Sequence, residues 1–141
     1  MSLANLLKIG QLKPHPADAA EIARLLAAAE RSLADARAET ISAETRFDAA
    51  YRSITQIGLA ALMAQGYRPD TNRPGHHMTI IQTLTLTLGI DARRMAVLDT
   101  LRRKRNLVDY TGTDVDDASV AACIEAAEKL LNDAKASVGS R

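Results

Sequence analysis

Apolar residues recur at three- and four-residue steps along most of this chain, and this spacing constrains the fold more than any other feature. Such a step is that of one face of an α-helix. Residues 17–38 show it most completely, with charged side chains on the other side. The apolar face consists of Ile22, Leu25, Leu26, Ala29, Leu33 and Ala36. We therefore predict a helix over residues 17–38.

Start and stop signals divide the following part of the chain. Ser42 is suited to the N-cap of a second helix, and Gly66 would end it in a left-handed conformation. Asp91 is suited to cap another helix, which runs to about Asn106 or slightly beyond, before Gly112 breaks the chain. The second helix carries Phe47, Ala50, Tyr51, Ile54, Ile57, Gly58, Ala61 and Leu62 on its apolar face. We expect its two aromatic side chains to lie in the core.

A last helix is predicted after Thr113 and Asp116, which resemble a capping box with Asp in place of Glu. Its apolar face contains Val120, Cys123, Ile124, Ala127, Leu131 and Ala134. We expect Cys123 to be an inert core residue.

Residues 76–89 fit two patterns. Thr83–Leu88 alternates strictly between Thr and Leu, which is typical of a strand. Ile80, Ile81, Leu84 and Leu88 also match one face of a helix. A lone strand would have no partner elsewhere in the chain, so we predict a helix.

Length and composition favour one all-α domain. The chain has 141 residues, only 3% aromatic residues and no Trp, so its core must be aliphatic and rich in Ala. Small Ala faces let helices approach closely. We predict one all-α bundle of four to five helices over residues 17–135. Irregular residues 1–16, with one docking turn around Leu3, Leu6 and Leu7, would precede it, and a frayed tail, residues 136–141, would follow.

Several classes of site are not expected. The formal net charge is only +1, so contact with a nucleic acid would need a local basic patch. Cys123 is the single cysteine, which excludes an internal disulfide and a cysteine zinc site. His76 and His77 would point about 100° apart on a helix, so we predict no metal site and no cofactor. Without a signal peptide or an apolar run of membrane-spanning length, we expect a cytoplasmic protein that does not enter a membrane.

The strongest candidate for a polar centre is Leu101–Tyr110, LRRKRNLVDY. Helical phase taken from Met95 and Leu98 puts three polar residues on the inward face and two cations outside. The inward residues are Arg102, Arg105 and Asn106, and the outward ones are Arg103 and Lys104. An inward charge requires a partner. The candidates are a second subunit, an anion such as phosphate, or a carboxylate of Asp48, Asp99, Asp109 or Glu44.

Three segments give the chain a resemblance to the HEPN family of nucleotide-binding helical bundles. They are Arg102-x-x-Arg105-Asn106 followed by Tyr110, the run RFDAAYRSI over residues 46–54, and the connection from Gly66-Tyr67-Arg68-Pro69 to Gly75-His76-His77. The resemblance covers residues 17–135. It implies a mostly antiparallel helical bundle that forms a homodimer. It also implies a toxin–antitoxin, defence or other RNA-processing system, with a nucleotidyltransferase-like antitoxin or another operon partner.

The resemblance also implies specific roles. In the active HEPN proteins that this chain resembles, the motif of a metal-independent endoribonuclease is an Arg that binds the scissile phosphate, then four to six positions, then a His that helps to transfer protons. Arg105 matches that Arg and Asn106 its polar neighbour, whereas Tyr110 stands where the window for the His begins. A Tyr, with an ordinary pKa of about 10, is a poor base at neutral pH.

We therefore expect binding of RNA, a nucleotide or a partner protein at Arg102, Arg105 and Asn106, without efficient catalysis. One alternative is a divergent endoribonuclease that uses Tyr110, or His77 approaching from another helix. Another is a purely structural dimerisation module. In the loop over residues 66–75, Tyr67 and Arg68 either anchor a turn or form the rim of a ligand or partner site.

Overall fold

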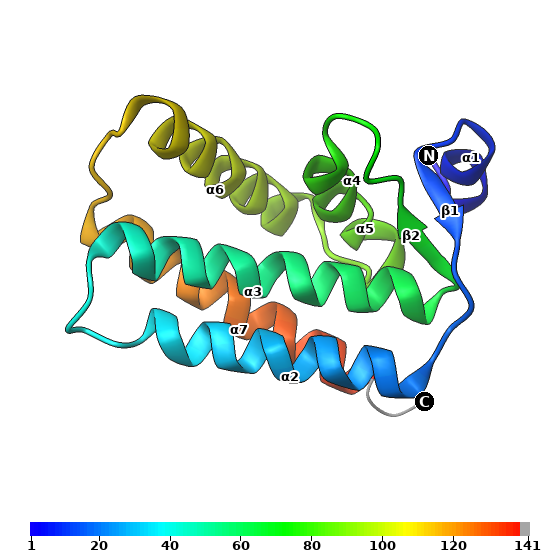
Figure 1. Ribbon diagram of the computed structural model, residues 1–141, viewed down its shortest axis with the longest axis horizontal. Coiled ribbons are helices and arrows are strands. Elements are labelled where there is room, and N and C mark those ends of the chain that lie inside the picture. The colour runs from blue at the N-terminus through cyan, green and yellow to red at the C-terminus, as the bar shows by residue number, and fades with distance from the viewer. Residues whose placement is uncertain (139–141) are drawn as a thin grey trace.

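Four long helices make up most of the molecule, which we describe from a computed structural model over residues 1–138 (Figure 1). They are α2 (Ala19–Ala36), α3 (Ala43–Ala64), α6 (Ala92–Thr111) and α7 (Asp117–Ser137). The prediction of a mainly helical bundle is confirmed. None of the helices within residues 1–138 is both long and apolar enough to cross a membrane.

Local capping explains where the long helices begin and end. The side chain of Ser42 accepts a hydrogen bond from the backbone N–H of Thr45, as predicted for the start of α3. Asp91 caps α6 in the same way, by accepting from the N–H of Arg94. Gly112 ends α6 with a φ of 68°, a left-handed conformation that favours glycine.

Helix α3 is the centre of the bundle. It packs against α2 and α7 on one side and against α4, α5 and α6 on the other (Figure 1). Buried alanines let α2, α3 and α7 approach closely. These alanines include Ala29, Ala36, Ala50, Ala60, Ala127 and Ala134. Phe47 and Tyr51 are buried in this core, as predicted. The hydroxyl of Ser53 donates to the carbonyl of Ala29 and ties α3 to α2.

The ambiguous segment is helical, in two short pieces. α4 (His76–Gln82) is followed by α5 (Leu84–Thr87), so the prediction of a helix over a strand is confirmed. α4 lies directly on α3 at Gly58, where a Cβ atom would be only 2.6 Å from Cγ2 of Ile80. Glycine at this position therefore sets how close α4 comes to α3.

The prediction that residues 1–16 are irregular apart from one turn is wrong. After α1 (Leu3–Lys8), strand β1 (Leu12–Pro14) pairs antiparallel with β2 (Tyr67–Pro69) in the loop after α3. Each strand has three residues and ends in proline, so neither carries a readable alternation. The predicted docking turn exists as α1, whose Leu3 and Leu6 pack against a small cluster of Leu12, Leu62 and Ile80.

Two predictions about the last helix also need correction. Thr113 does not cap it, because the N-cap residue of α7 is Asp116 and the intervening residues form a connection. Helix α7 continues to Ser137, so the predicted frayed tail is helical at residues 136–137. The rest of that prediction, at residues 139–141, lies outside the described residues.

Candidate anion-binding site

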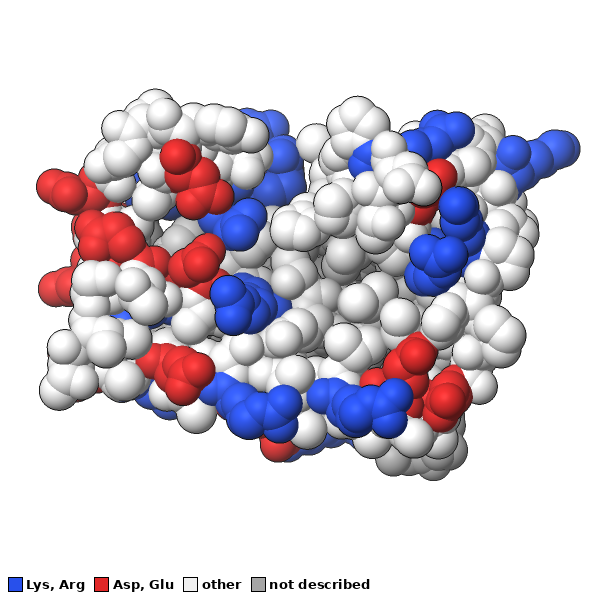
Figure 2. All heavy atoms as spheres, viewed as in Figure 1, with Lys and Arg blue, Asp and Glu red and all other residues white. Residues whose placement is uncertain are grey.

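The predicted polar centre lies where α6 and α4 face each other over α3. Both helices pack against α3 and against one another. Figure 2 shows the surface hollowed between them, with cationic side chains on the α6 side. Arg102 and Arg105 come from α6, His77 from α4, and Asp48 and Tyr51 from α3. We call these five residues the Arg105 cluster.

Arg105 is held by partners on two helices. Its Nε donates to Oδ1 of Asp48 at 3.1 Å, and its Nη1 lies 3.8 Å from Oδ2 of Asp109. Its guanidinium carbon is 5.0 Å from the centroid of the Tyr51 ring, a distance typical of a cation–π contact. The side chain is 27% exposed. Of the partners considered from the sequence, Arg105 therefore has a carboxylate of another helix, Asp48.

The ion pair with Asp48 leaves one edge of the Arg105 guanidinium open. Asp48 takes the Nε–H, and the separation of 3.8 Å between Nη1 and Asp109 is too long for a hydrogen bond. Within residues 1–138, neither terminal nitrogen of Arg105 makes a hydrogen bond. These two nitrogens form the fork that binds phosphate or carboxylate through two parallel bonds.

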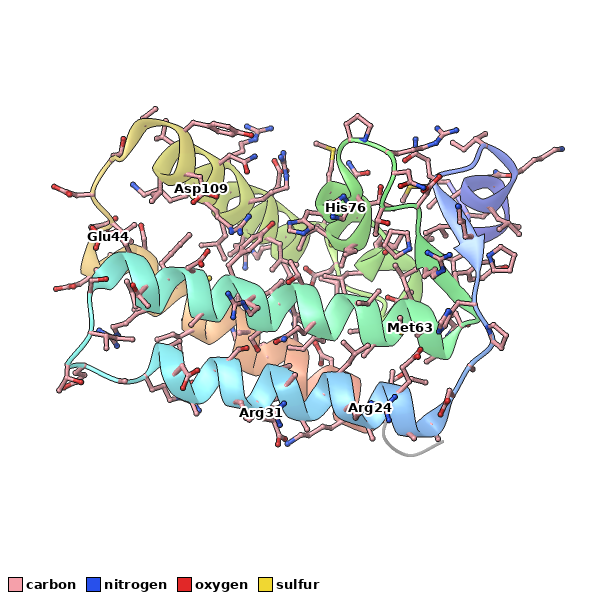
Figure 3. All side chains as sticks on the ribbon, viewed as in Figure 1. Arg24, Arg31, Glu44, Met63, His76 and Asp109 are labelled. Atoms are coloured by element: carbon pink, nitrogen blue, oxygen red, sulfur yellow. The ribbon has the colours of Figure 1, made fainter. Side chains whose placement is uncertain are left out.

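Arg102 is paired along its own helix. Its Nε and Nη2 lie 3.2 and 2.9 Å from Oδ1 of Asp99. Arg103 lies 3.0 Å from the other oxygen of Asp99, so one carboxylate serves two arginines. Glu44, the remaining candidate partner from the sequence, lies at the start of α3 and makes no ion pair with a described residue (Figure 3).

Tyr51 forms the floor of the Arg105 cluster. Its side chain is only 2% exposed, and its hydroxyl makes no hydrogen bond with any residue from 1 to 138. Burial raises the pKa of Tyr51, against the opposing effect of the charges of Arg105 and Arg102. The hydroxyl therefore keeps its proton at neutral pH and can act as a hydrogen-bond donor.

His77, on α4, is within electrostatic reach of Arg105. Its pKa is lowered below the ordinary value by partial burial, by His76 and by the charge of Arg105. The two His rings meet edge to face, with centroids 4.6 Å apart. His77 is thus mainly neutral at pH 7, and a neutral imidazole can accept a proton or donate one hydrogen bond.

The predicted inward position of Asn106 is wrong, and so is the outward position of Lys104. Asn106 is exposed, whereas Lys104 is partly buried and lies 3.9 Å from Asp116. The buried residues of α6 are Leu98 and Leu101, not Met95. At about 100° per residue, Asn106 points roughly 140° away from Leu101. Taking the phase from Met95 therefore rotated the expected face.

Tyr110 is not part of the Arg105 cluster. It is 87% exposed near the end of α6, on the solvent side with Asn106. Sequence reasoning assigned Tyr51 to the core and did not connect it with Arg105. Its spacing from Asp48, three residues along one helix, was the available signal, because such residues share a face.

Neither a protein-family model nor a curated protein matches this sequence. A functional assignment therefore depends on the side chains just described.

Proposed function

We propose that this chain is a HEPN-like helical module of a bacterial RNA-targeting, toxin–antitoxin or defence system. It binds RNA, or a nucleotide, through a phosphate at the Arg105 cluster, without efficient catalysis. Homodimerisation and a nucleotidyltransferase-like antitoxin, or another operon partner, remain predictions that follow from the resemblance.

The convergence of three separate segments carries this proposal. The run RFDAAYRSI supplies Asp48 and Tyr51, the Arg-x-x-Arg-Asn motif supplies Arg105, and the connection ending in Gly-His-His supplies His77. These are the segments on which the resemblance was based, and each supplies a side chain that interacts with Arg105 or is affected by its charge. A helix packed only for stability has no need of three polar segments at one place.

The geometry suits a phosphate because the donors are held in advance. Asp48 fixes the Nε side of Arg105, and the Tyr51 ring supports its flat face. The terminal fork then faces the ligand with little further loss of side-chain freedom. The Tyr51 hydroxyl would add a third donor. The carboxylates of Asp48 and Asp109 oppose an anion, which predicts moderate, salt-sensitive binding.

The exposed position of Tyr110 supports the absence of efficient catalysis at the position of the motif His. One observation nevertheless favours divergent endoribonuclease activity as a second candidate. His77 is near enough to Arg105 for that charge to lower its pKa, so its neutral, base-competent form prevails at pH 7. Arg105 would bind the scissile phosphate, and His77 would accept the proton of the attacking 2′-hydroxyl.

Fluorescence anisotropy with short single-stranded RNA tests the binding proposal. Arg105→Ala should weaken binding by about tenfold or more, since charge-assisted hydrogen bonds contribute about 1.5–3 kcal/mol. Arg103→Ala is the matched control, because it removes the same charge from the solvent side of the same helix. Equal affinity of the native protein and both variants would remove the proposal.

Cleavage of end-labelled RNA separates the two candidates. The binding module should leave the RNA intact in the presence of chelator. Activity that disappears in both Arg105→Ala and His77→Ala, but persists in His15→Ala, would establish the ribonuclease instead. His15 is a suitable control because it pairs with Glu21 in the N-terminal region.

A further inference from the structure

A pocket of about 300 Å³ opens between α3, α4 and β2. His77 lines this pocket and is also a member of the Arg105 cluster. One wall is apolar and is formed by Leu59, Met63 and Pro69. The opposite wall carries His76 and His77, with Arg68 at the same opening. Figure 3 marks the two walls by Met63, near the end of α3, and His76, at the start of α4.

The polar lining of this pocket is cationic or neutral throughout. The lining also includes hydroxyl and amide side chains, and none of the lining residues within 1–138 carries a carboxylate. In this it differs from the Arg105 cluster, where each arginine has an acidic neighbour. An anion in the pocket would meet no like charge on its walls.

Arg68 lacks the partner that a partly buried arginine ordinarily has. Its side chain makes no ion pair or hydrogen bond with any residue from 1 to 138. Its neighbour across the strand pair is another cation, Lys13, and like charges in that position repel. Lys13 is neutralised by Asp70 at 3.8 Å, which leaves Arg68 as the unbalanced charge.

Size and lining together define the ligand. Small-molecule sites have volumes of about 300–1,000 Å³, so this pocket suits a ligand at the small end of the range. The apolar wall can hold a flat ring, because Met adapts its shape to aromatic surfaces. The guanidinium of Arg68 and the imidazoles opposite suit a phosphate.

We propose that this pocket binds a phosphorylated ligand of mononucleotide size, with its phosphate at Arg68 and the His pair and its base against Met63 and Pro69. The ligand is either a free mononucleotide or the phosphorylated terminal nucleotide of an RNA strand. This site is distinct from the Arg105 cluster and shares only His77 with it, so it does not depend on the proposed function of that cluster.

NMR titration of the native protein with AMP, UMP, adenosine and inorganic phosphate tests the proposal. Amide shifts should change along the C-terminal half of α3, β2 and the first turn of α4, and the mononucleotides should bind at least tenfold more tightly than either fragment. Changes confined to other surfaces, or equal binding of inorganic phosphate alone, would overturn the assignment.

Arg68→Ala should weaken mononucleotide binding at least tenfold, with the melting temperature unchanged because the Arg68 side chain has no partner within residues 1–138. Arg73→Ala is the matched control, since it removes a cation of the same loop that lies outside the pocket and pairs with Asp70. Affinity equal in Arg68→Ala and the native protein would refute the site.

Oligonucleotides with a 5′-phosphate or a 5′-hydroxyl distinguish the two sources of the ligand. A preference for the phosphorylated strand that is lost in Arg68→Ala, but kept in Arg105→Ala, identifies an RNA terminus as the ligand. Tight mononucleotide binding without that preference identifies a free nucleotide. No preference and no mononucleotide binding would reject the proposal while leaving the Arg105 cluster to its own test.

Discussion

Substituting Gly58 with Ala tests how α4, and with it His76 and His77, is held on α3. A Cβ at this position would lie 2.6 Å from Cγ2 of Ile80 and 3.4 Å from the Ile80 carbonyl oxygen. The first separation is far shorter than the 3.5–4.0 Å or so at which carbon atoms attract. Because Ile80 is buried, α4 must shift away from α3 to admit the methyl group.

Two opposing effects set the magnitude. Gly→Ala inside a helix stabilises it by about 0.8–1.0 kcal/mol. Overpacking a well-packed core costs about 1–3 kcal/mol. The sum predicts that Gly58→Ala lowers the free energy of unfolding by between zero and about 2 kcal/mol, where an unobstructed helical glycine would give an increase.

Ile80→Ala removes the obstructing Cγ2 and should reverse the sign. In that background Gly58→Ala should stabilise the protein by up to about 1 kcal/mol, the helix-propensity gain alone. The native protein, the two single variants and the double variant form a double-mutant cycle. Urea denaturation of these four proteins, followed by circular dichroism, gives the coupling energy between positions 58 and 80. The same increase in stability in both backgrounds would refute the close packing of α4 against α3, and with it the positions assigned to the His pair.

Three further predictions concern single side chains. Asp48→Asn should strengthen binding of short RNA severalfold at low salt, since it removes a negative charge beside Arg105; anisotropy showing weaker or unchanged binding would argue against a phosphate there. Cys123 is fully buried, and burial raises the pKa of its thiol to about 12. Iodoacetamide at neutral pH should therefore label it only as fast as the protein unfolds. Rapid labelling of the native protein would contradict this prediction. His77 should titrate by NMR below the ordinary value of about 6.5, and Arg105→Gln should raise its pKa. Because that pKa is lowered in the folded state, the contribution of His77 to stability is complete above the ordinary value and declines as the pH falls below it; a midpoint at or above 6.5 would refute the assignment.

The sequence predicted best what depends on short-range chemistry. Ser42 and Asp91 cap the helices that they were expected to cap, and Gly112 ends α6 where it was expected to break the chain. These signals act within one helical turn, so they can be read without knowing the tertiary structure. The choice of a helix for residues 76–89 is confirmed, although the chain does contain two strands, β1 and β2, which pair with each other.

What the sequence did not predict depends on contacts between distant segments. Strands β1 and β2 are too short to show a pattern, and each exists only because the other is beside it. The face of α6 was misjudged because Met95 is apolar but lies beside the buried stripe of Leu98 and Leu101. The angle of Asn106 was measured from Met95, which is only partly buried, so Asn106 was predicted to face inward although it is exposed.

The open terminal edge of Arg105 and the unpaired Arg68 were beyond sequence reasoning for a different reason. Each depends on which acidic residues come near in three dimensions. Asp48 was among several candidate partners for Arg105, but the sequence could not say which nitrogen it would occupy. Arg68 has cations and imidazoles nearby instead of a carboxylate, and this became visible only once β2 was placed beside β1.

Strand β1 does not line the mononucleotide pocket, but it pairs with β2, which carries the lining residues Arg68 and Pro69. The first residues of the chain are therefore coupled to the pocket. The pair joins segments far apart in the sequence through a three-residue ladder and the small Leu12 cluster, separate from the main core. Such a unit can open on its own while the long helices stay folded. The amide hydrogens of Leu12 and Lys13 should therefore exchange earlier than those of α3, and a ligand held by Arg68 should slow that exchange. Occupancy of the pocket would then be readable at the amino-terminal end of the chain.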